Sequence, residues 1–173
     1  MKVLKFGGTS VGSAQRIKDV ASLITSRGKN IIVLSAMSGT TNTLVEISDY
    51  LYKKNTDGAK ETINSLEAKY FCTINELYST EEYKDKAMKE VKACFNYMRS
   101  FTKDIFTMFE EKEILAQGEL ISTNLFNNYL NEIGEKSILL PALEFVKTDK
   151  NGEPDTQFIQ EELNKQIQKQ PNA

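Results

Sequence analysis

The chain has 173 residues, a length that suits one domain with a buried core. Lys and Arg number 22 and Asp and Glu 24, so the net charge is −2, a balance that disfavours a nucleic-acid-binding surface. Histidine is absent, which excludes Ser-His-Asp and Cys-His nucleophilic catalysis, histidine zinc sites and histidine acid–base chemistry.

The cysteines and the hydropathy pattern point to an intracellular protein. Cys72 and Cys94 lie far apart and form no CxxC pair, so we expect two reduced, buried thiols rather than a disulfide. The opening residues 1–8 are broken by glycine too early to form a signal sequence. Since no apolar run approaches the roughly 20 residues of a membrane span, we expect a cytoplasmic protein without membrane contact.

The first part of the chain, residues 1–56, opens with a strand and a helix. Residues 3–6 (VLKF) contain three apolar residues and are followed by two glycines, which predicts a short strand. Apolar residues recur at helical spacing over residues 17–24 and predict a helix. Ser13 is a suitable N-cap for this helix, and Gly28 is a suitable stop.

A second strand and helix complete this part. Residues 31–34 are continuously apolar, as expected for a parallel strand that is covered on both faces. A loop of small polar residues follows at 35–42, and apolar spacing over residues 44–51 predicts the next helix. The strand–helix–strand–helix order is typical of a doubly wound α/β sheet.

The middle of the chain, residues 57–131, reads as helical. One apolar stripe covers residues 59–77, and a second covers 87–109 and predicts one long helix. Residues 113–131 predict a further helix that Gly134 ends. Because helical spacing accounts for the aromatic and methionine residues, we expect them in the core rather than around a ligand.

The last part, residues 132–173, returns to α/β character. Residues 137–140 predict a strand, and residues 145–146 predict the end of another. Residues 151–155 combine Asn, Gly, Pro and Asp and predict a turn. Apolar spacing over residues 158–167 predicts a final helix.

The segment after the first strand has the composition of a phosphate-binding loop. Lys5 places a positive charge at the strand end, and Gly7 and Gly8 permit close approach of backbone amides to an anion. Gly7 and Gly12 have GxxxxG spacing, but residues 13–14 are Ser-Ala where a P-loop has Lys followed by Ser or Thr. A tight structural turn is the alternative interpretation.

The loop at residues 35–42 strengthens the interpretation as an anion site. It follows a parallel strand, so it should face the same sheet edge as the first loop. A helix that starts near Thr41 or Asn42 would direct its positive end at an anion, although both residues could instead simply cap the helix.

Glu119 is the third candidate position. It lies in a helical segment with Leu115 and Phe126 on its own face, and a carboxylate on a partly apolar face requires a cation or hydrogen-bond donors. A solvated glutamate at the helix edge is the alternative.

Together these segments resemble the aspartate kinases of the amino-acid kinase superfamily. The resemblance rests on residues 5–10 (KFGGTS), 34–42 (LSAMSGTTN) and 118–122 (GELIS), with residues 148–155 as weaker support. It implies an α/β fold, a three-layer αβα sandwich of the carbamate kinase-like type with a mainly parallel sheet and a helical insertion. The family's later Arg-Gly-Gly-Ser-Asp segment, second half and ACT domains are not in the sequence. Residues 1–173 are therefore expected to be the N-terminal portion of a kinase domain with an incomplete fold, inactive alone.

The resemblance also implies an activity, the ATP-dependent phosphorylation of L-aspartate to 4-phospho-L-aspartate, the first step toward lysine, threonine, methionine and isoleucine. Lys5 would be catalytic, and Thr41 and Glu119 would bind aspartate. The residues implied at the ATP phosphates are Lys5, Phe6, Gly7, Gly8 and Ser35. Mg²⁺ would accompany ATP without a protein metal site. The partners implied are small molecules, and the full-length protein is expected to be a homo-oligomer.

Other functions remain open at this stage. The chain could belong to a kinase of the same superfamily that acts on glutamate, acetylglutamate or a nucleoside monophosphate. It could also be an anion-binding or regulatory module without catalysis, or, less in keeping with the loops, a helical interaction domain.

Overall fold

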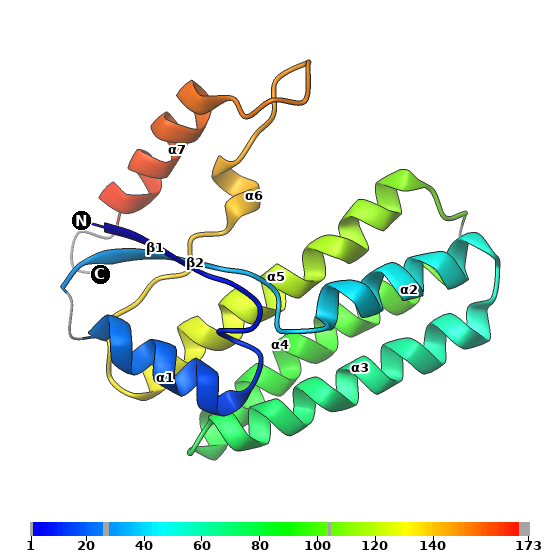
Figure 1. Ribbon diagram of the computed structural model, residues 1–173, viewed down its shortest axis with the longest axis horizontal. Coiled ribbons are helices and arrows are strands. Elements are labelled where there is room, and N and C mark those ends of the chain that lie inside the picture. Colours follow the sequence, from blue (N-terminus) through cyan, green and yellow to red (C-terminus); the bar gives the residue numbers. More distant parts are fainter. Residues whose placement is uncertain (1, 26–27, 104, 170–173) are drawn as a thin grey trace. The chain divides into compact units, whose positions relative to one another are not determined.

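The computed structural model describes residues 2–25, 28–103 and 105–169. They form two compact units, Met1–Glu135 and Lys136–Ala173. The elements in chain order are β1 (Lys2–Phe6), α1 (Ala14–Thr25), β2 (Asn30–Leu34), α2 (Thr40–Tyr52), α3 (Thr56–Leu77), α4 (Glu81–Ser100), α5 (Met108–Glu132), α6 (Ala142–Phe145) and α7 (Thr156–Gln168) (Figure 1).

The described strands, β1 and β2, form a parallel pair in which Lys2 lies opposite Asn30 and Phe6 opposite Leu34. One face packs on the core through Leu4, Phe6, Ile32 and Leu34. The other face carries Val33, which is 43% exposed. The prediction that the second strand is covered on both faces is therefore wrong for this chain, because a continuous apolar run identifies a strand but not the surfaces that cover it.

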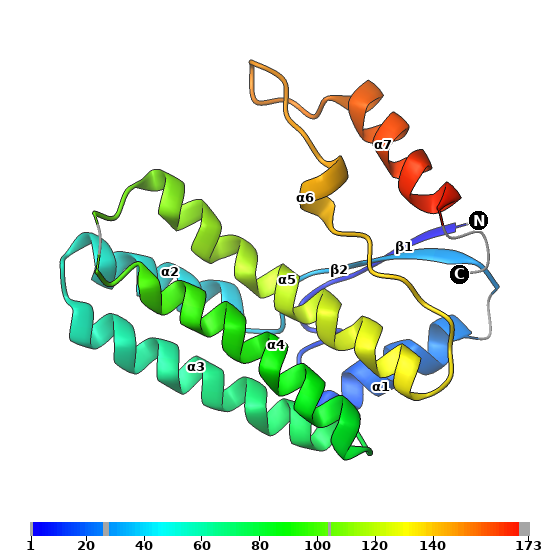
Figure 2. The same cartoon turned by 180° about the vertical axis from the view of Figure 1, so that it is seen from behind.

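Helices α2, α3, α4 and α5 form the main core of the first unit. Each packs on the next, and α5 returns to pack on α2, so the helices surround a common interior (Figure 2). Tyr70 and Phe95 lie fully buried there, with ring centroids 5.8 Å apart. Since α1 packs on α3 and β2 packs on α5, the helical segment and the parallel strands belong to one unit.

The single long helix predicted over residues 87–109 is wrong. α4 ends at Ser100, and α5 begins at Met108 rather than at residue 113. The start of α5 is set by a capping box, in which the Thr107 hydroxyl accepts the Phe109 N–H and the Glu110 carboxylate accepts the Thr107 N–H at 2.8 Å. Ile105, which lies between the two helices, is 86% exposed. Helical spacing of apolar residues therefore does not identify a buried helix face between α4 and α5.

The second unit confirms the predicted turn and final helix but not the predicted strands. Residues 137–140 form no strand within the described part of this unit, because no neighbouring strand lies alongside them there. Of the two residues predicted to end a strand, Phe145 is instead the last residue of the short helix α6, and Val146 is its C-cap. An isolated antiparallel bridge joins Thr148 to Pro154, and the Asp155 side chain caps α7 by accepting the Phe158 N–H.

The two cysteines are free thiols with different surroundings. Cys94 is half-buried, and burial together with the nearby Glu90 charge raises the pKa of its thiol. Cys72 is exposed on α3, so the prediction of a buried side chain is wrong at this position. Tyr70 and Thr73 face the core and Cys72 does not, since helix faces rotate by about 100° per residue.

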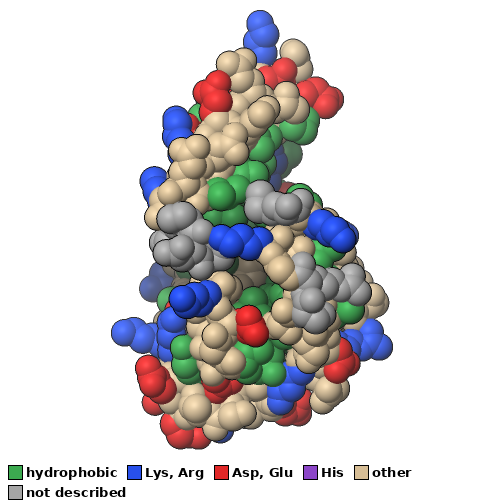
Figure 3. Space-filling view, turned by 90° about the vertical axis from the view of Figure 1, so that its left-hand side faces the viewer, with side chains coloured by type: hydrophobic (Ala, Val, Ile, Leu, Met, Phe, Trp, Pro, Cys, Tyr) green, Lys and Arg blue, Asp and Glu red, His purple; other side chains and the backbone are tan. Residues whose placement is uncertain are grey.

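The surface carries charges of both signs. Figure 3 shows Lys and Arg side chains interspersed with Asp and Glu on the face that it draws. In the part of the chain that the structure describes, no helix combines the length and the apolar character that crossing a membrane requires.

Candidate functional site

Two loops leave the same end of the parallel strands and contact each other. The first loop (residues 7–13) follows β1, and the second loop (residues 35–39) follows β2. The Ser35 N–H donates to the Phe6 carbonyl at 3.1 Å, which extends the strand pairing into the second loop. The predicted meeting of two loops at one sheet edge is confirmed by this contact.

The contact between the loops requires glycine. A Cβ on Gly8 would lie 2.7 Å from the Ala36 carbonyl oxygen, which is backbone and cannot move aside independently. A Cβ on Gly12 would lie 2.9 Å from the Ser38 Cβ. These two glycines therefore permit the close approach of the loops, and their role is packing in addition to any contact with an anion.

Lys5 and Gly7 are accessible at this edge. Phe6 is half-buried on the sheet face that packs on the core. The Lys5 side chain projects from the opposite face and is exposed. A Cβ on Gly7 would meet no atom within 4 Å, so space is open above this residue. The Ser10 N–H donates to the Gly7 carbonyl at 2.9 Å and closes a turn. The arrangement leaves room for a ligand beside a lysine charge.

Arg16 holds the first loop from α1. Its guanidinium donates to the Thr9 carbonyl. The Ser13 hydroxyl accepts the Arg16 N–H at 3.4 Å, in agreement with the predicted N-cap. The sequence gives no local signal for the Arg16 contact, because an arginine in the first helical turn is usually solvated.

The second loop leads into α2 through Gly39, whose φ of 82° is left-handed. Gly39 is the N-cap and provides no side-chain hydrogen bond, and the first turn of α2 contains no acidic residue. Thr41 lies exposed in that turn. The alternative in which Thr41 or Asn42 caps the helix is therefore wrong, and the positive end of α2 is open to an anion.

Glu119 extends from α5 to the second loop. Its Oε1 accepts the Ala36 N–H at 3.2 Å, although the side chain is otherwise exposed. The preceding Gly118 lets α5 approach, because a Cβ there would lie 2.8 Å from the Ala36 Cβ and 3.2 Å from the Thr40 Cγ2. Glu119 thus has both solvent access and a backbone donor as partner.

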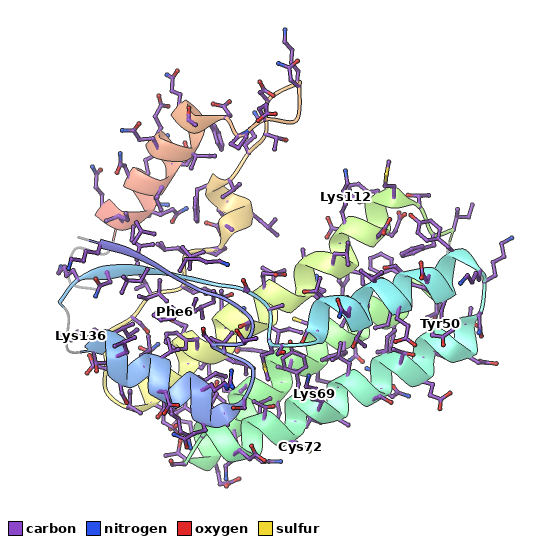
Figure 4. All side chains as sticks on the ribbon, viewed as in Figure 1. Phe6, Tyr50, Lys69, Cys72, Lys112 and Lys136 are labelled. Atoms are coloured by element: carbon purple, nitrogen blue, oxygen red, sulfur yellow. The ribbon has the colours of Figure 1, made fainter. Side chains whose placement is uncertain are left out.

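Two residues of α3, not singled out from the sequence as site residues, contact the second loop and the start of α2. The side chain of Lys69 is labelled on α3 in Figure 4, and its Nζ donates to the Ser38 carbonyl at 2.8 Å. The Tyr70 hydroxyl lies 2.9 Å from the Thr40 Oγ1. Burial raises the pKa of Tyr70 to about 12, and the Glu119 charge acts in the same direction. The phenol is therefore neutral at physiological pH and can donate or accept in its pair with Thr40.

The donor groups at this edge are suited to an anion. They are backbone amides, hydroxyls and the Lys5 ammonium group, which bind phosphate or carboxylate rather than cations. Among the described residues, no three or more Cys, Asp or Glu side chains cluster in a way that could hold a metal ion. The fold and the site together define an α/β protein whose sheet edge carries groups of the kind that bind anions.

The comparisons with known proteins give the family. The sequence model of the amino acid kinase family matches residues 1–172, and the chain belongs to this family. Aspartokinase 2, a chloroplastic protein of Arabidopsis thaliana, is 33% identical over 153 residues, which cover 85% of this chain and 28% of that protein. An aspartate kinase of Pseudomonas putida is 48% identical over 50 residues, or 27% of this chain and 12% of that protein.

Solved structures show the same fold. Escherichia coli aspartokinase III in complex with aspartate and ADP superimposes with a TM-score of 0.78 at 23% identity, covering 99% of this chain and 38% of that one. Clostridium acetobutylicum aspartate kinase gives 0.74 at 18% identity, covering 96% and 36%. The predicted amino-acid kinase fold class is confirmed, and the chain spans less than two fifths of these relatives.

Proposed function

We propose that this chain acts in the ATP-dependent phosphorylation of L-aspartate, which gives 4-phospho-L-aspartate and ADP and begins the synthesis of lysine, threonine, methionine and isoleucine. The observation that carries the proposal is the hydrogen bond that joins Glu119 to the second loop. This loop lies beside the glycine-containing first loop, which follows a strand with Lys5 as its last residue but one. Support also comes from the relatives, which are named aspartokinases, and from a structural neighbour described with aspartate and ADP.

The first loop is the proposed nucleotide side. Lys5 would neutralise negative charge on the phosphoryl group in transit, and the backbone of Gly7 and Gly8, with open space above Gly7, would hold ATP phosphates. Phe6 contributes its backbone, and Ser35 lies beside it through their hydrogen bond. Mg²⁺ would be bound mainly by the phosphates of ATP, which fits the lack of an acidic cluster among the described residues.

The second loop and α5 are the proposed aspartate side. Glu119 Oε1 is occupied by the Ala36 N–H, which leaves Oε2 to accept from the α-ammonium group of the substrate. Thr41, exposed in the first turn of α2, would donate its hydroxyl to a substrate carboxylate. The two residues would thus recognise the charged groups that distinguish an amino acid from other carboxylates.

The proposed reaction needs no histidine. The side-chain carboxylate of aspartate is ionised at neutral pH, so no base has to remove a proton from it. One of its oxygens bonds to the γ-phosphorus of ATP, while the bond from that phosphorus to the bridging oxygen breaks and its electron pair leaves with ADP. Catalysis of this transfer consists mainly of positioning and charge stabilisation, which Lys5 and the loop amides would provide.

The proposal is tested with a chimera in which this chain replaces the matching segment of Arabidopsis aspartokinase 2. A coupled assay of ADP release is expected to show turnover with L-aspartate and none with L-glutamate, N-acetyl-L-glutamate or a nucleoside monophosphate. Turnover with another of these substrates, or a folded chimera that is inactive with all of them, would contradict the proposal.

The chain alone is expected to show no turnover. In the described residues the arginine side chains are Arg16, which donates to the Thr9 carbonyl, and Arg99, which pairs with Glu67, so both already have partners within the chain. Aspartate-dependent ADP release by the 173-residue chain would contradict this expectation.

Glu119→Gln is expected to raise the KM of the chimera for aspartate about 10- to 100-fold while kcat changes little. Glutamine retains the oxygen that accepts the Ala36 N–H but loses the charge opposite the substrate ammonium, and a charged hydrogen bond contributes about 1.5–3 kcal/mol. Steady-state kinetics at saturating ATP measure the effect. Glu76→Gln, at an exposed position on α3, is the matched control and should leave KM unchanged. An equal loss in kcat would contradict a role in binding.

A further inference from the structure

Two consecutive residues of helix α3 contact the backbone segment that leads from the second loop into α2. One contacts the residue before Gly39, and the other contacts the residue after it. Lys69 donates to the carbonyl of Ser38, and Tyr70 pairs with the hydroxyl of Thr40. Lys69 and Tyr70 belong to the helical segment and lie outside the sequence motifs, whereas Ser38 and Thr40 lie within the motif at residues 34–42. The two contacts suggest that α3 acts on the site from outside it.

Gly39 allows the backbone between Ser38 and Thr40 to change conformation at little energetic cost. Its φ of 82° lies in the region that glycine adopts at little cost, and it has no side chain through which neighbouring groups could hold it. Rotation about the Gly39 backbone would redirect the first turn of α2, which carries Thr41. A contact that holds the peptide before Gly39 therefore governs the direction of that turn.

Lys69 is placed to provide this contact. The hydrogen bond from its ammonium group to the Ser38 carbonyl is 2.8 Å long and charge-assisted, and it spans 31 positions of the sequence. Its Nζ would lie 3.7 Å from a Cβ built on Gly39, so the ammonium group lies against the glycine itself. Since the Lys69 side chain is exposed, its loss should remove this hold without opening a cavity.

Tyr70 holds the other side of Gly39 from within the core. Its ring is fully buried against Phe95, and its hydroxyl meets the buried Thr40 at 2.9 Å. This contact is part of the core, so changes at Tyr70 alter stability together with loop position. Lys69 is exposed, so its replacement should change the position of the loop without changing the stability of the chain.

We propose that Lys69 is a positioning residue, which fixes the Ser38–Gly39 peptide and thereby directs the first turn of α2 at the substrate. The inference rests on the proposed function for the identity of that substrate. It assigns to the helical segment a task in aspartate binding that is separate from packing. Lys69 contacts the loop and not the reacting atoms.

The first test measures amide hydrogen exchange in the 173-residue chain without ligand. The Thr40 N–H donates to the Met37 carbonyl and the Thr43 N–H to the Gly39 carbonyl, so both amides report on this backbone segment. Lys69→Met is expected to speed their exchange about tenfold with an unchanged Tm, and Lys69→Arg, which retains a cationic donor, should restore slow exchange. Lys60→Met, at an exposed position on the same helix, is the matched control and should change neither amide.

The second test measures steady-state kinetics in the chimera. Lys69→Met is expected to raise the KM for aspartate about tenfold while the KM for ATP and kcat stay within about twofold, and Lys69→Arg should return the KM for aspartate toward the original value. A general loss of structure would move all three parameters together.

The outcomes separate the positioning role from the proposed function. Unchanged exchange at Thr40 and Thr43 in Lys69→Met overturns the positioning role, whatever the kinetics show. Faster exchange with an unaltered KM for aspartate also overturns it, since the loop would then move without affecting the substrate. Faster exchange in a chain whose folded chimera does not use aspartate contradicts the proposed function and limits Lys69 to holding the loop.

Discussion

Replacement of Lys5 by methionine is expected to lower kcat of the chimera about 10²- to 10³-fold, the loss typical of removing one donor that stabilises transition-state charge. The side chain projects from the exposed face of β1, and methionine keeps its length and apolar stem without the ammonium group. The KM for aspartate should change less than about threefold, because the proposed aspartate contacts come from α2 and α5. Steady-state ADP release measures both parameters.

Lys2→Met is the matched control for this prediction. Lys2 is an exposed lysine on the same strand but at the opposite end from the loops. Its replacement removes one positive charge from the protein while leaving the proposed phosphate region intact, so kcat should stay within about twofold. A similar loss of kcat in both variants would mean that net charge, rather than the place of Lys5, determines the rate.

Tyr70→Ala is expected to lower the free energy of unfolding by about 3–5 kcal/mol, the usual cost of removing a large buried aromatic side chain. Tyr70 is 0% exposed, it packs on the Phe95 ring, and it is the hydrogen-bond partner of the buried Thr40 hydroxyl. Because the free energy of unfolding of a whole domain is about 5–15 kcal/mol, this loss should remove a large part of the stability of the chain. Urea unfolding followed by circular dichroism measures it.

Tyr70→Phe separates the hydroxyl from the ring. Phenylalanine fills the same space and leaves only Thr40 without its partner, so the expected loss is about 1 kcal/mol. The Tyr70→Phe, Thr40→Val pair should recover part of that loss, since the double replacement removes both hydroxyls of this pair and leaves neither position with an unpaired one. A loss in Tyr70→Ala no larger than in Tyr70→Phe would show that the ring does not stabilise the core.

The parts of the site that the sequence predicts correctly are those set by local chemistry. Gly7 and Gly8 after an apolar run identify a loop at a strand end, and Ser13 identifies the helix start that follows. The parallel pairing then brings the two loops together without further information, because both strands end at the same edge. The roles assigned to Lys5 and Thr41 stay predictions that the kinetic variants test.

What the sequence does not predict depends on contacts between distant segments. The hydrogen bond from Lys69 to Ser38 links α3 to a loop 31 positions earlier, and an exposed lysine in a helix gives no sign of it. Glu119 has a backbone amide as its partner, which no side-chain pattern reveals. The boundary before α5 did have a local signal, since Thr107 and Glu110 have the spacing of a capping box within an otherwise apolar stripe.

The exposed thiol of Cys72 provides a means of observing the loop without altering it. Cys72 lies three residues after Lys69 on α3 (Figure 4), and residues at that spacing are neighbours on the helix surface. The chain has one further cysteine, Cys94, whose half-burial and raised pKa slow its reaction with thiol reagents. A maleimide dye would therefore attach first at Cys72, where its fluorescence would report loop movement as substrates are added to the otherwise unmodified sequence.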